Sequence, residues 1–298
     1  MKNRFAGLLP VLCGMMLAVL PSPLSASERL SVFVSIPPQK YFVEQIGKDR
    51  VVVNVMVQPG TSPHTYEPRP KQMVAISRTR LYFTIGVEFE TVWINRLAAT
   101  NPAMEIVATQ QGIQRIPISG GHPEDERHEQ QGSSPHDGLD PHIWLSPPLV
   151  QQQAKTMLAA LQKTDPANAS FYATNCDQFL QALSELDQGL KDTFRGKQNR
   201  QFLVFHPTWG YFAHAYGLQQ IAIEIEGKNP KPAQLQQIIQ HAREHQIRII
   251  FAQPQFSVRN ARLVAKAING EVVLVDPLAE NWMDNLRLVA EKFQQAMQ

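Results

Sequence analysis

Short apolar runs rich in β-branched residues alternate with segments of helical periodicity along most of this chain. The expected strands form two series, at 30–36, 51–57, 81–85 and 105–108, and at 201–205, 219–225, 247–252 and 271–275. This alternation is typical of a mostly parallel sheet with helices on its faces, because parallel strands need a crossover segment between them. Two series predict an α/β protein with two Rossmann-like lobes.

Residues 168–195 separate the two series and contain no expected strand. Their apolar residues recur at three- or four-residue intervals, as from Phe179 to Leu183, Leu186 and Leu190. This spacing predicts one long amphipathic helix of about 39 Å, which can act as a rigid connector between lobes. We therefore expect an N-terminal lobe, a linking helix and a C-terminal lobe, with limits 28–165, 168–196 and 197–298. The helices expected within the lobes are 39–47, 71–79, 210–216, 233–245 and 258–268.

The first residues have the layout of a secretory signal peptide. Lys2 and Arg4 precede an apolar run at 8–20, which is followed by a stretch of small residues. The apolar run is too short to cross a bilayer as a helix. We expect cleavage after Ala26 or Ser27 and an exported, periplasmic mature protein.

Charge and cysteine content narrow the function classes. The chain has 28 basic and 26 acidic residues, and removal of Lys2 and Arg4 with the signal peptide balances the two. A neutral exported protein is a poor candidate for binding nucleic acid. Only Cys176 then remains, so neither an intramolecular disulfide nor a paired-cysteine metal site is expected. Any bound metal must be held by imidazole and carboxylate groups.

Three histidines and one aspartate stand in short loops that we expect to be ordered. His64 lies in the proline-rich stretch "PGTSPHTYEP", His142 in "DPHIWLSP", His206 directly after an expected strand, and Asp276 directly after another. Proline restricts the backbone of itself and of the residue before it, which limits the shapes of the first loop. Ligand sites of open α/β sheets lie outside the carboxyl ends of the strands. Each residue alone is weak evidence, but together they predict a binding site.

The stretch 119–139 differs from the rest of the chain. It contains His122, His128 and His136 among several carboxylates and almost no large apolar residue. We expect a surface loop, because it has nothing to bury. Tracts of this kind can gather metal loosely, although a solvated loop with incidental histidines is the alternative.

Four stretches resemble the signatures of a known family. They are "PGTSPHTYEPRP", "DPHIWLSP", "HPTWGYFAHAYGL" and "FAQPQFSVRNARLVAKAINGEVVLVDPLAEN". The chain resembles the metal-specific solute-binding proteins of ABC transporters, the zinc and manganese uptake group, over essentially its whole mature length. The resemblance implies two α/β lobes joined by a long helix, with the metal site between them. It also implies that His64, His142, His206 and Asp276 are the ligands, and that an ABC permease and its ATPase are the partners. We expect a monomer.

Two positions depart from the family pattern. Trp209 stands in the loop after the third ligand, where members commonly have a small residue, and is interpreted as a wall of the pocket. Lys231 stands where many relatives carry glutamate. Glu67, three residues after His64, is expected to form a hydrogen bond near the site rather than to bind the metal.

The expected function is capture and delivery of zinc rather than catalysis. Asp276 can close the fourth position that a catalytic zinc keeps open for water, and the sequence has no HExxH or GxSxG motif. Three imidazoles suit Zn²⁺ better than Mn²⁺, which prefers oxygen ligands. The alternatives are delivery of manganese or iron, a secreted zinc hydrolase with Asp276 or Glu67 as the base, and a siderophore or haem binder of similar shape.

Overall fold

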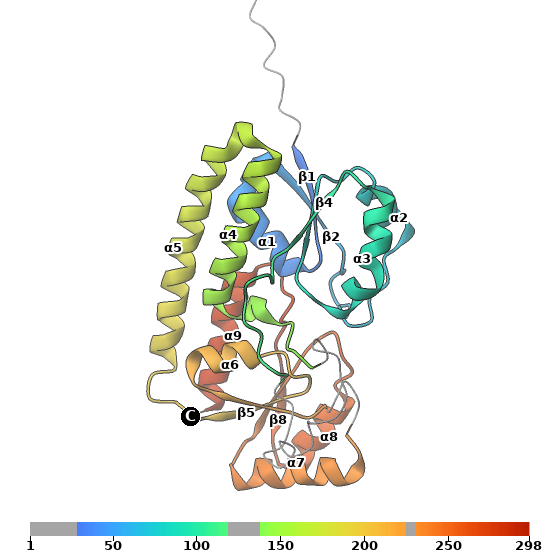
Figure 1. Ribbon diagram of the computed structural model, residues 1–298. Coiled ribbons are helices and arrows are strands. Elements are labelled where there is room, and N and C mark those ends of the chain that lie inside the picture. Colours follow the sequence, from blue (N-terminus) through green and yellow to red (C-terminus); the bar gives the residue numbers. More distant parts are fainter. Residues whose placement is uncertain (1–28, 119–137, 225–229, 298) are drawn as a thin grey trace, which may run out of the picture.

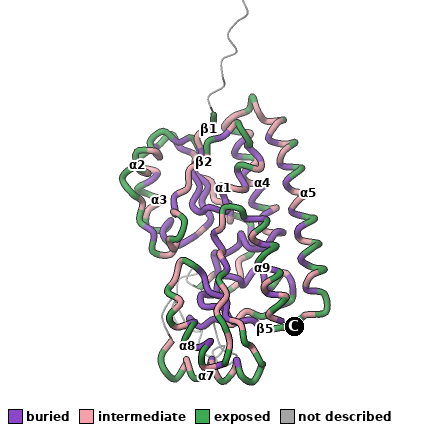
Figure 2. Tube along the Cα trace, turned by 180° about the vertical axis from the view of Figure 1, so that it is seen from behind, coloured by how far each residue is buried: buried purple, intermediate pink, exposed green. Residues whose placement is uncertain are grey.

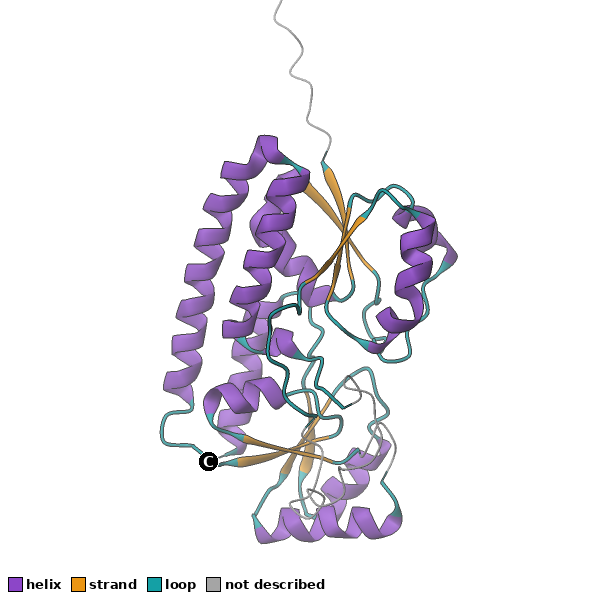
Figure 3. Ribbon diagram, viewed as in Figure 1, coloured by secondary structure: helices purple, strands orange, loops and turns teal. Residues whose placement is uncertain are grey.

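The computed structural model describes residues 29–118, 138–224 and 230–297. Two four-stranded sheets, each with all its strand pairs parallel, lie one above the other with helices around them (Figures 1 and 3). The predicted α/β fold with two lobes is confirmed. The predicted signal peptide and most of the predicted 119–139 loop lie outside the described residues. Among the residues described, no helix combines the length and hydropathy needed to cross a bilayer.

The two sheets share one topology. The first has the strand order β2-β1-β3-β4 and the second the order β6-β5-β7-β8, so each begins with a strand that ends up inside the sheet. The strands are β1 (Leu30–Val34), β2 (Val51–Val55), β3 (Leu81–Thr84), β4 (Glu105–Ala108), β5 (Gln201–Val204), β6 (Gln219–Ala222), β7 (Ile249–Ala252) and β8 (Glu271–Leu274). In each sheet, the first crossover leads to a strand on one side of the first strand, and the second crossover leads to a strand on its other side. In open α/β sheets, ligands bind outside the carboxyl ends of the strands at such a reversal of strand order.

The helices of the lobes follow the strands in turn. They are α1 (Pro37–Gly47), α2 (Pro70–Ile76) and α3 (Glu88–Thr100) in the first lobe, and α6 (Gly210–Tyr216), α7 (Pro232–Glu244), α8 (Arg259–Ala267) and α9 (Trp282–Ala296) in the second. The helices α1, α2 and α7 have proline in their first turn, where its missing amide hydrogen is not needed. The helices α3 and α9 were not predicted from the sequence.

Two antiparallel helices, α4 (Pro147–Thr164) and α5 (Ala169–Thr193), form one side of the molecule (Figure 1). The prediction of a long helix at 168–195 is confirmed by α5, whose 25 residues extend about 37 Å. Its buried stripe includes Cys176, Leu183 and Leu190. The helix α9, which follows the last strand of the second sheet, also packs against α5. The predicted limits of the lobes stay a prediction.

One apolar core continues through both lobes, as Figure 2 shows by the buried trace that runs from one sheet to the other. At the junction the ring of Phe42 in α1 lies 5.0 Å from that of Trp282 in α9 and 6.0 Å from that of Phe179 in α5. A smaller cluster, with Ile238 and Val264 among its members, lies between the second sheet and the helices α7 and α8. The lobes are therefore joined by buried apolar contacts as well as by α5.

Two buried tryptophans connect the segment between the lobes to the loop after β8. The indole nitrogen of Trp144 donates to the carbonyl of Pro277 over 2.8 Å, and that of Trp282 donates to the carbonyl of Trp144 over 2.8 Å. Each side chain is 1 % exposed. Buried hydrogen bonds of this kind are costly to leave unmade, so the two segments are held in one relative position.

We predict that Phe293→Ala destabilises the protein by about 3–5 kcal/mol, because it leaves a cavity in the core. Phe293 is fully buried, and its ring lies 4.5 Å from Phe202 and 4.3 Å from Phe251. Urea unfolding measures the change in free energy. The control is Val92→Ala on α3, where a side chain that is 65 % exposed should change stability by less than about 0.5 kcal/mol. Equal effects of the two substitutions would contradict the described core.

Candidate metal site

Three histidines from distant parts of the chain converge between the two sheets. His64 lies in the loop after β2, His142 directly before a 3-10 turn at Ile143–Leu145, and His206 directly after β5. One ring nitrogen of each lies within 4.8 Å of those of the other two. The Nε2 atoms of His64 and His206 are 3.0 Å apart although 142 residues separate them in sequence. The structure thus brings together three of the four predicted ligands.

His64 is held by a carboxylate from α3. Its Nδ1 lies 2.7 Å from Oε2 of Glu88, the first residue of that helix. Partial burial alone would raise the pKa of Glu88, but the hydrogen bond and charge of His64 outweigh it and lower the pKa to about 2. Glu88 is therefore ionised at neutral pH and can only accept, so the Nδ1 of His64 carries the hydrogen.

The loop that carries Glu88 is itself fixed by a buried carboxylate. Glu90 is 5 % exposed and accepts hydrogen bonds from the amides of Ile85, at 2.9 Å, and of Gly86, at 2.7 Å. Gly86 has a φ of +89° and lies against the guanidinium of Arg115, where a Cβ atom would meet Nη2 at 1.7 Å. The positive φ favours glycine at this position. The two hydrogen bonds to Glu90 hold the loop in this conformation.

His142 is held by the aspartate two residues before it. A single oxygen of Asp140, Oδ1, lies 2.8 Å from the backbone nitrogen and 2.6 Å from Nδ1 of His142. Asp140 is fully buried and His142 is 2 % exposed. The short "DPH" stretch thus contains both the imidazole and the group that orients it, and Pro141 fixes the backbone between them.

His206 is held by Glu224, which follows β6. The distance from Nδ1 of His206 to Oε2 of Glu224 is 3.0 Å, and the two residues are 9 % and 6 % exposed. Burial lowers the pKa of His206, and the neighbouring histidines lower it further, while the hydrogen bond that His206 donates to Glu224 raises it. The lowered pKa keeps the imidazole neutral at pH 7, which is the form that binds a metal.

The three Nδ1–carboxylate pairs direct the free nitrogens to one point. Where Nδ1 donates its hydrogen to a carboxylate, Nε2 of a neutral ring presents a lone pair. Two such lone pairs 3.0 Å apart, on His64 and His206, repel each other unless a proton or a metal ion lies between them. Two nitrogens bound to one tetrahedral Zn²⁺ lie about 3.3 Å apart, so the arrangement suits this ion.

The fourth predicted ligand, Asp276, is not part of the group formed by the three histidines. It follows β8 and is half-buried. Its Oδ1 accepts hydrogen bonds from Nε2 of Gln255 at 2.7 Å and from the amide of Leu278 at 2.9 Å. Its role as a ligand stays a prediction.

The carboxylate partners of His64 and His206 were missed by the sequence analysis. Glu67, which was expected to bond near the site, is exposed, and the partner of His64 is Glu88. A signal was present, since Glu88 and Glu224 each stand within four residues of the end of an apolar strand.

The interpretation of Trp209 as a wall of the pocket is wrong. This side chain is fully buried and packs against the rings of Phe212 and Phe293, at 5.8 and 5.4 Å, in the core beside the second sheet. Its size and apolar character are used for packing. The histidines of the acidic stretch, His122, His128 and His136, lie outside the described residues.

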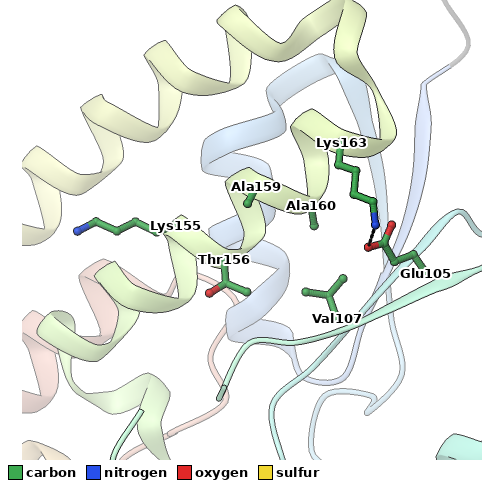
Figure 4. A pocket seen from close by; sticks show the side chains of 7 residues that line it. All are labelled: Glu105, Val107, Lys155, Thr156, Ala159, Ala160 and Lys163. Carbon is green, nitrogen blue, oxygen red and sulfur yellow. Dashed lines mark hydrogen bonds and ion pairs between the residues drawn. The ribbon is translucent and has the colours of Figure 1, made fainter. Parts of the chain in front are cut away.

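A pocket of about 490 Å³ between β4 and α4 contains none of the predicted site residues (Figure 4). An ion pair of 2.7 Å between Lys163 and Glu105 lies at its edge, and Ala159 and Val107 line it. It has no convergent imidazole or unpaired carboxylate among its lining residues, so its chemistry does not compete with that of the histidine cluster.

We predict that Glu88→Ala weakens metal binding by about 10- to 100-fold, because the ring of His64 loses its orienting partner. Glu67→Ala is the matched control, since Glu67 is exposed in the loop that carries His64. Competition with a chromophoric chelator measures the dissociation constant for Zn²⁺. The same affinity in both variants would show that Glu88 does not orient a ligand.

Comparison with known proteins agrees with the fold and with the site. The profile of the family described as zinc-uptake complex component A, periplasmic, matches residues 32–296. Two crystal structures of ZnuA are similar, one at 39 % identity with a TM-score of 0.83, covering 91 % of this chain and all of that one. The other is a ZnuA deletion mutant with zinc bound, at 40 % identity and a TM-score of 0.82, covering 90 % and 98 %.

A curated relative is more distant in sequence. The high-affinity zinc uptake system protein ZnuA of Bacillus subtilis (strain 168) is 28 % identical over 259 residues, which covers 85 % of this chain and 80 % of the relative. The family profile extends over both sheets and all three histidines of the cluster. This chain therefore belongs to the family of the periplasmic component A of zinc-uptake complexes.

Proposed function

We propose that this protein captures Zn²⁺ in the periplasm and delivers it to the permease of an ABC importer. The observation that carries the proposal is the convergence of three imidazoles whose Nδ1 atoms are all bonded to carboxylates. A site of this kind has neutral nitrogen ligands ready for a borderline-soft cation. The family of the chain and the zinc-bound structure of a relative support the same ion.

The proposed ligands are Nε2 of His64, His142 and His206, with one oxygen of Asp276 as the fourth. Negative charge favours a divalent cation here, since Asp276 supplies one charge and the three orienting carboxylates lie directly behind the rings. Four ligands complete the tetrahedral shell of Zn²⁺ and leave no position for a reactive water. The ion is thus a cargo that is bound and released.

The rest of the assembly follows from the family. We propose a monomer that acts with a membrane permease and a cytoplasmic ATPase, without nucleic acid as a partner. The signal peptide is proposed to be cleaved after Ala26 or Ser27, which places the mature protein in the periplasm.

A hydrolase is less well supported than a carrier. A catalytic zinc needs a carboxylate that activates water. Each of the three carboxylates beside the histidines, Glu88, Asp140 and Glu224, is instead bonded to an imidazole Nδ1. They orient ligands, and we propose that the protein is not an enzyme.

We predict that Zn²⁺ at a hundredfold excess over its Kd stabilises the protein by about 2.7 kcal/mol, because it binds the folded state only. Thermal unfolding should show a clear rise in Tm. His142→Ala should lose most of this rise while the metal-free variant stays folded. An undiminished rise in that variant would mean that His142 is not a ligand.

A second prediction concerns the preference between metals. His206→Glu replaces a nitrogen ligand by oxygen, which suits Mn²⁺ better than Zn²⁺. Zinc binding should weaken more than manganese binding. The ratio of the Mn²⁺ Kd to the Zn²⁺ Kd should therefore fall by about tenfold or more. Competition titrations with both ions on the same protein measure the ratio. Equal tightness of both ions in the unaltered protein, together with an unchanged ratio in the variant, would refute the assignment of zinc.

A further inference from the structure

Asp276 accepts both of its described side-chain hydrogen bonds on the same oxygen. Nε2 of Gln255 lies 2.7 Å from Oδ1, and the amide nitrogen of Leu278 lies 2.9 Å from the same atom. Across the described parts of the chain, no hydrogen bond reaches Oδ2. The two oxygens of this carboxylate are therefore unequal before any metal arrives.

The position of this carboxylate is fixed from several sides. The backbone carbonyl of Asp276 accepts a hydrogen bond from Nδ2 of Asn285 on α9, at 2.7 Å. The next carbonyl, that of Pro277, accepts the hydrogen bond from the indole of Trp144. The loop after β8 is thus tied to α9 and to the segment that carries His142.

The segment after β7 holds both ligand loops of the second sheet. Gln253 is fully buried, and its amide pairs with the backbone of His206, accepting from the nitrogen at 3.3 Å and donating to the carbonyl at 2.8 Å. Two residues later, Gln255 reaches Asp276. This is a consequence of the strand order, because β7 lies between β5, which precedes His206, and β8, which precedes Asp276.

An oxygen that already accepts two hydrogen bonds is a poor metal ligand, since the donors occupy its lone-pair directions. Asp276 can then offer a metal only Oδ2. A single carboxylate oxygen with three imidazoles gives the four ligands of tetrahedral Zn²⁺. Mn²⁺ prefers oxygen ligands and a six-coordinate shell, which two oxygens from one carboxylate would help to fill.

We propose that Gln255 determines the metal preference of the site by occupying Oδ1 of Asp276, so that this carboxylate binds through one oxygen and Mn²⁺ is disfavoured. Gln255 is a positioning residue that acts through Asp276 and does not bind the ion. Its own Oε1 is buried without a hydrogen-bond partner among the described residues, so the amide donor is the part of the side chain that is used. The inference rests on the proposed function and on Asp276 as a ligand.

The test compares Gln255→Leu, which removes the donor at similar volume, with Gln255→Met, which keeps an unbranched side chain of similar length but offers no donor. Gln151→Leu is the matched control, because Gln151 is a half-buried glutamine on α4 that bonds to Ser184 on α5. For each protein, the Kd of Zn²⁺ and of Mn²⁺ is measured by chelator competition. The absorption of bound Co²⁺ reports the coordination number, since tetrahedral Co²⁺ absorbs visible light much more strongly than six-coordinate Co²⁺.

The ratio of the Mn²⁺ Kd to the Zn²⁺ Kd should fall about tenfold in both variants, the size expected when a hydrogen bond to a charged group is lost. The visible absorption of bound Co²⁺ should weaken in the same two variants and stay strong in the control. If Gln255→Leu fails to fold, which urea unfolding shows, the result for Gln255→Met decides. A ratio and a Co²⁺ spectrum like those of the control would overturn the inference.

Failure of the inference can be told apart from failure of the proposed function. If Asp276→Asn binds Zn²⁺ as tightly as the unaltered protein while His142→Ala does not, Asp276 is no ligand. The inference about Gln255 then fails, and the role in zinc uptake stands. If His142→Ala also binds Zn²⁺ normally, the proposed zinc site itself is wrong.

Discussion

The hydrogen bond between an imidazole Nδ1 and a carboxylate, made three times, is the constraint on which the site depends. An isolated histidine ring rotates and presents either nitrogen, whereas each ring here has its Nδ1 fixed by Glu88, Asp140 or Glu224. Fixing one nitrogen aims the other, so the convergence of three Nε2 atoms is a property of the carboxylates as much as of the histidines. The surrounding fold serves to hold these carboxylates, as Glu90 and Gly86 do for the loop of Glu88.

The three converging histidines could be predicted from the sequence better than their carboxylate partners, because two of the partners lie far away along the chain. His64, His142 and His206 stand in stretches whose prolines and neighbouring strands are local features, readable without a structure. The partner of His64 is 24 residues away and that of His206 is 18, and only Asp140 is near its histidine in sequence, two residues before it. Which distant carboxylate contacts which ring depends on how the crossover segments pack against the sheet. The pattern of one sequence does not reveal this packing.

Part of the fold was also readable and part was not. The alternation of strands and helices predicted both sheets and α5, since periodicity reports which face is buried. The helix α9 has Trp282, Leu286, Val289 and Phe293 on one face, so its pattern was present although it was not identified. That these residues join a core shared by both lobes could not be predicted, because pattern identifies a buried face and not what covers it. The shared core favours small local movements of the ligand loops over a wide opening of one lobe from the other.

The lone thiol of the described chain has a consequence for a protein that carries a thiol-seeking metal through an oxidising compartment. Cys176 lies on α5, fully buried, with its Sγ 3.9 Å from the carbonyl of Ala154. Burial, assisted by the charge of Asp177, raises the pKa of this thiol to about 11. Oxidants and soft metal ions react with the thiolate, which is almost absent at such a pKa. Burial of this thiol in α5 therefore keeps its sulfur from competing for the zinc ion. Among the described residues it also leaves no exposed thiol through which two copies of the protein could be cross-linked.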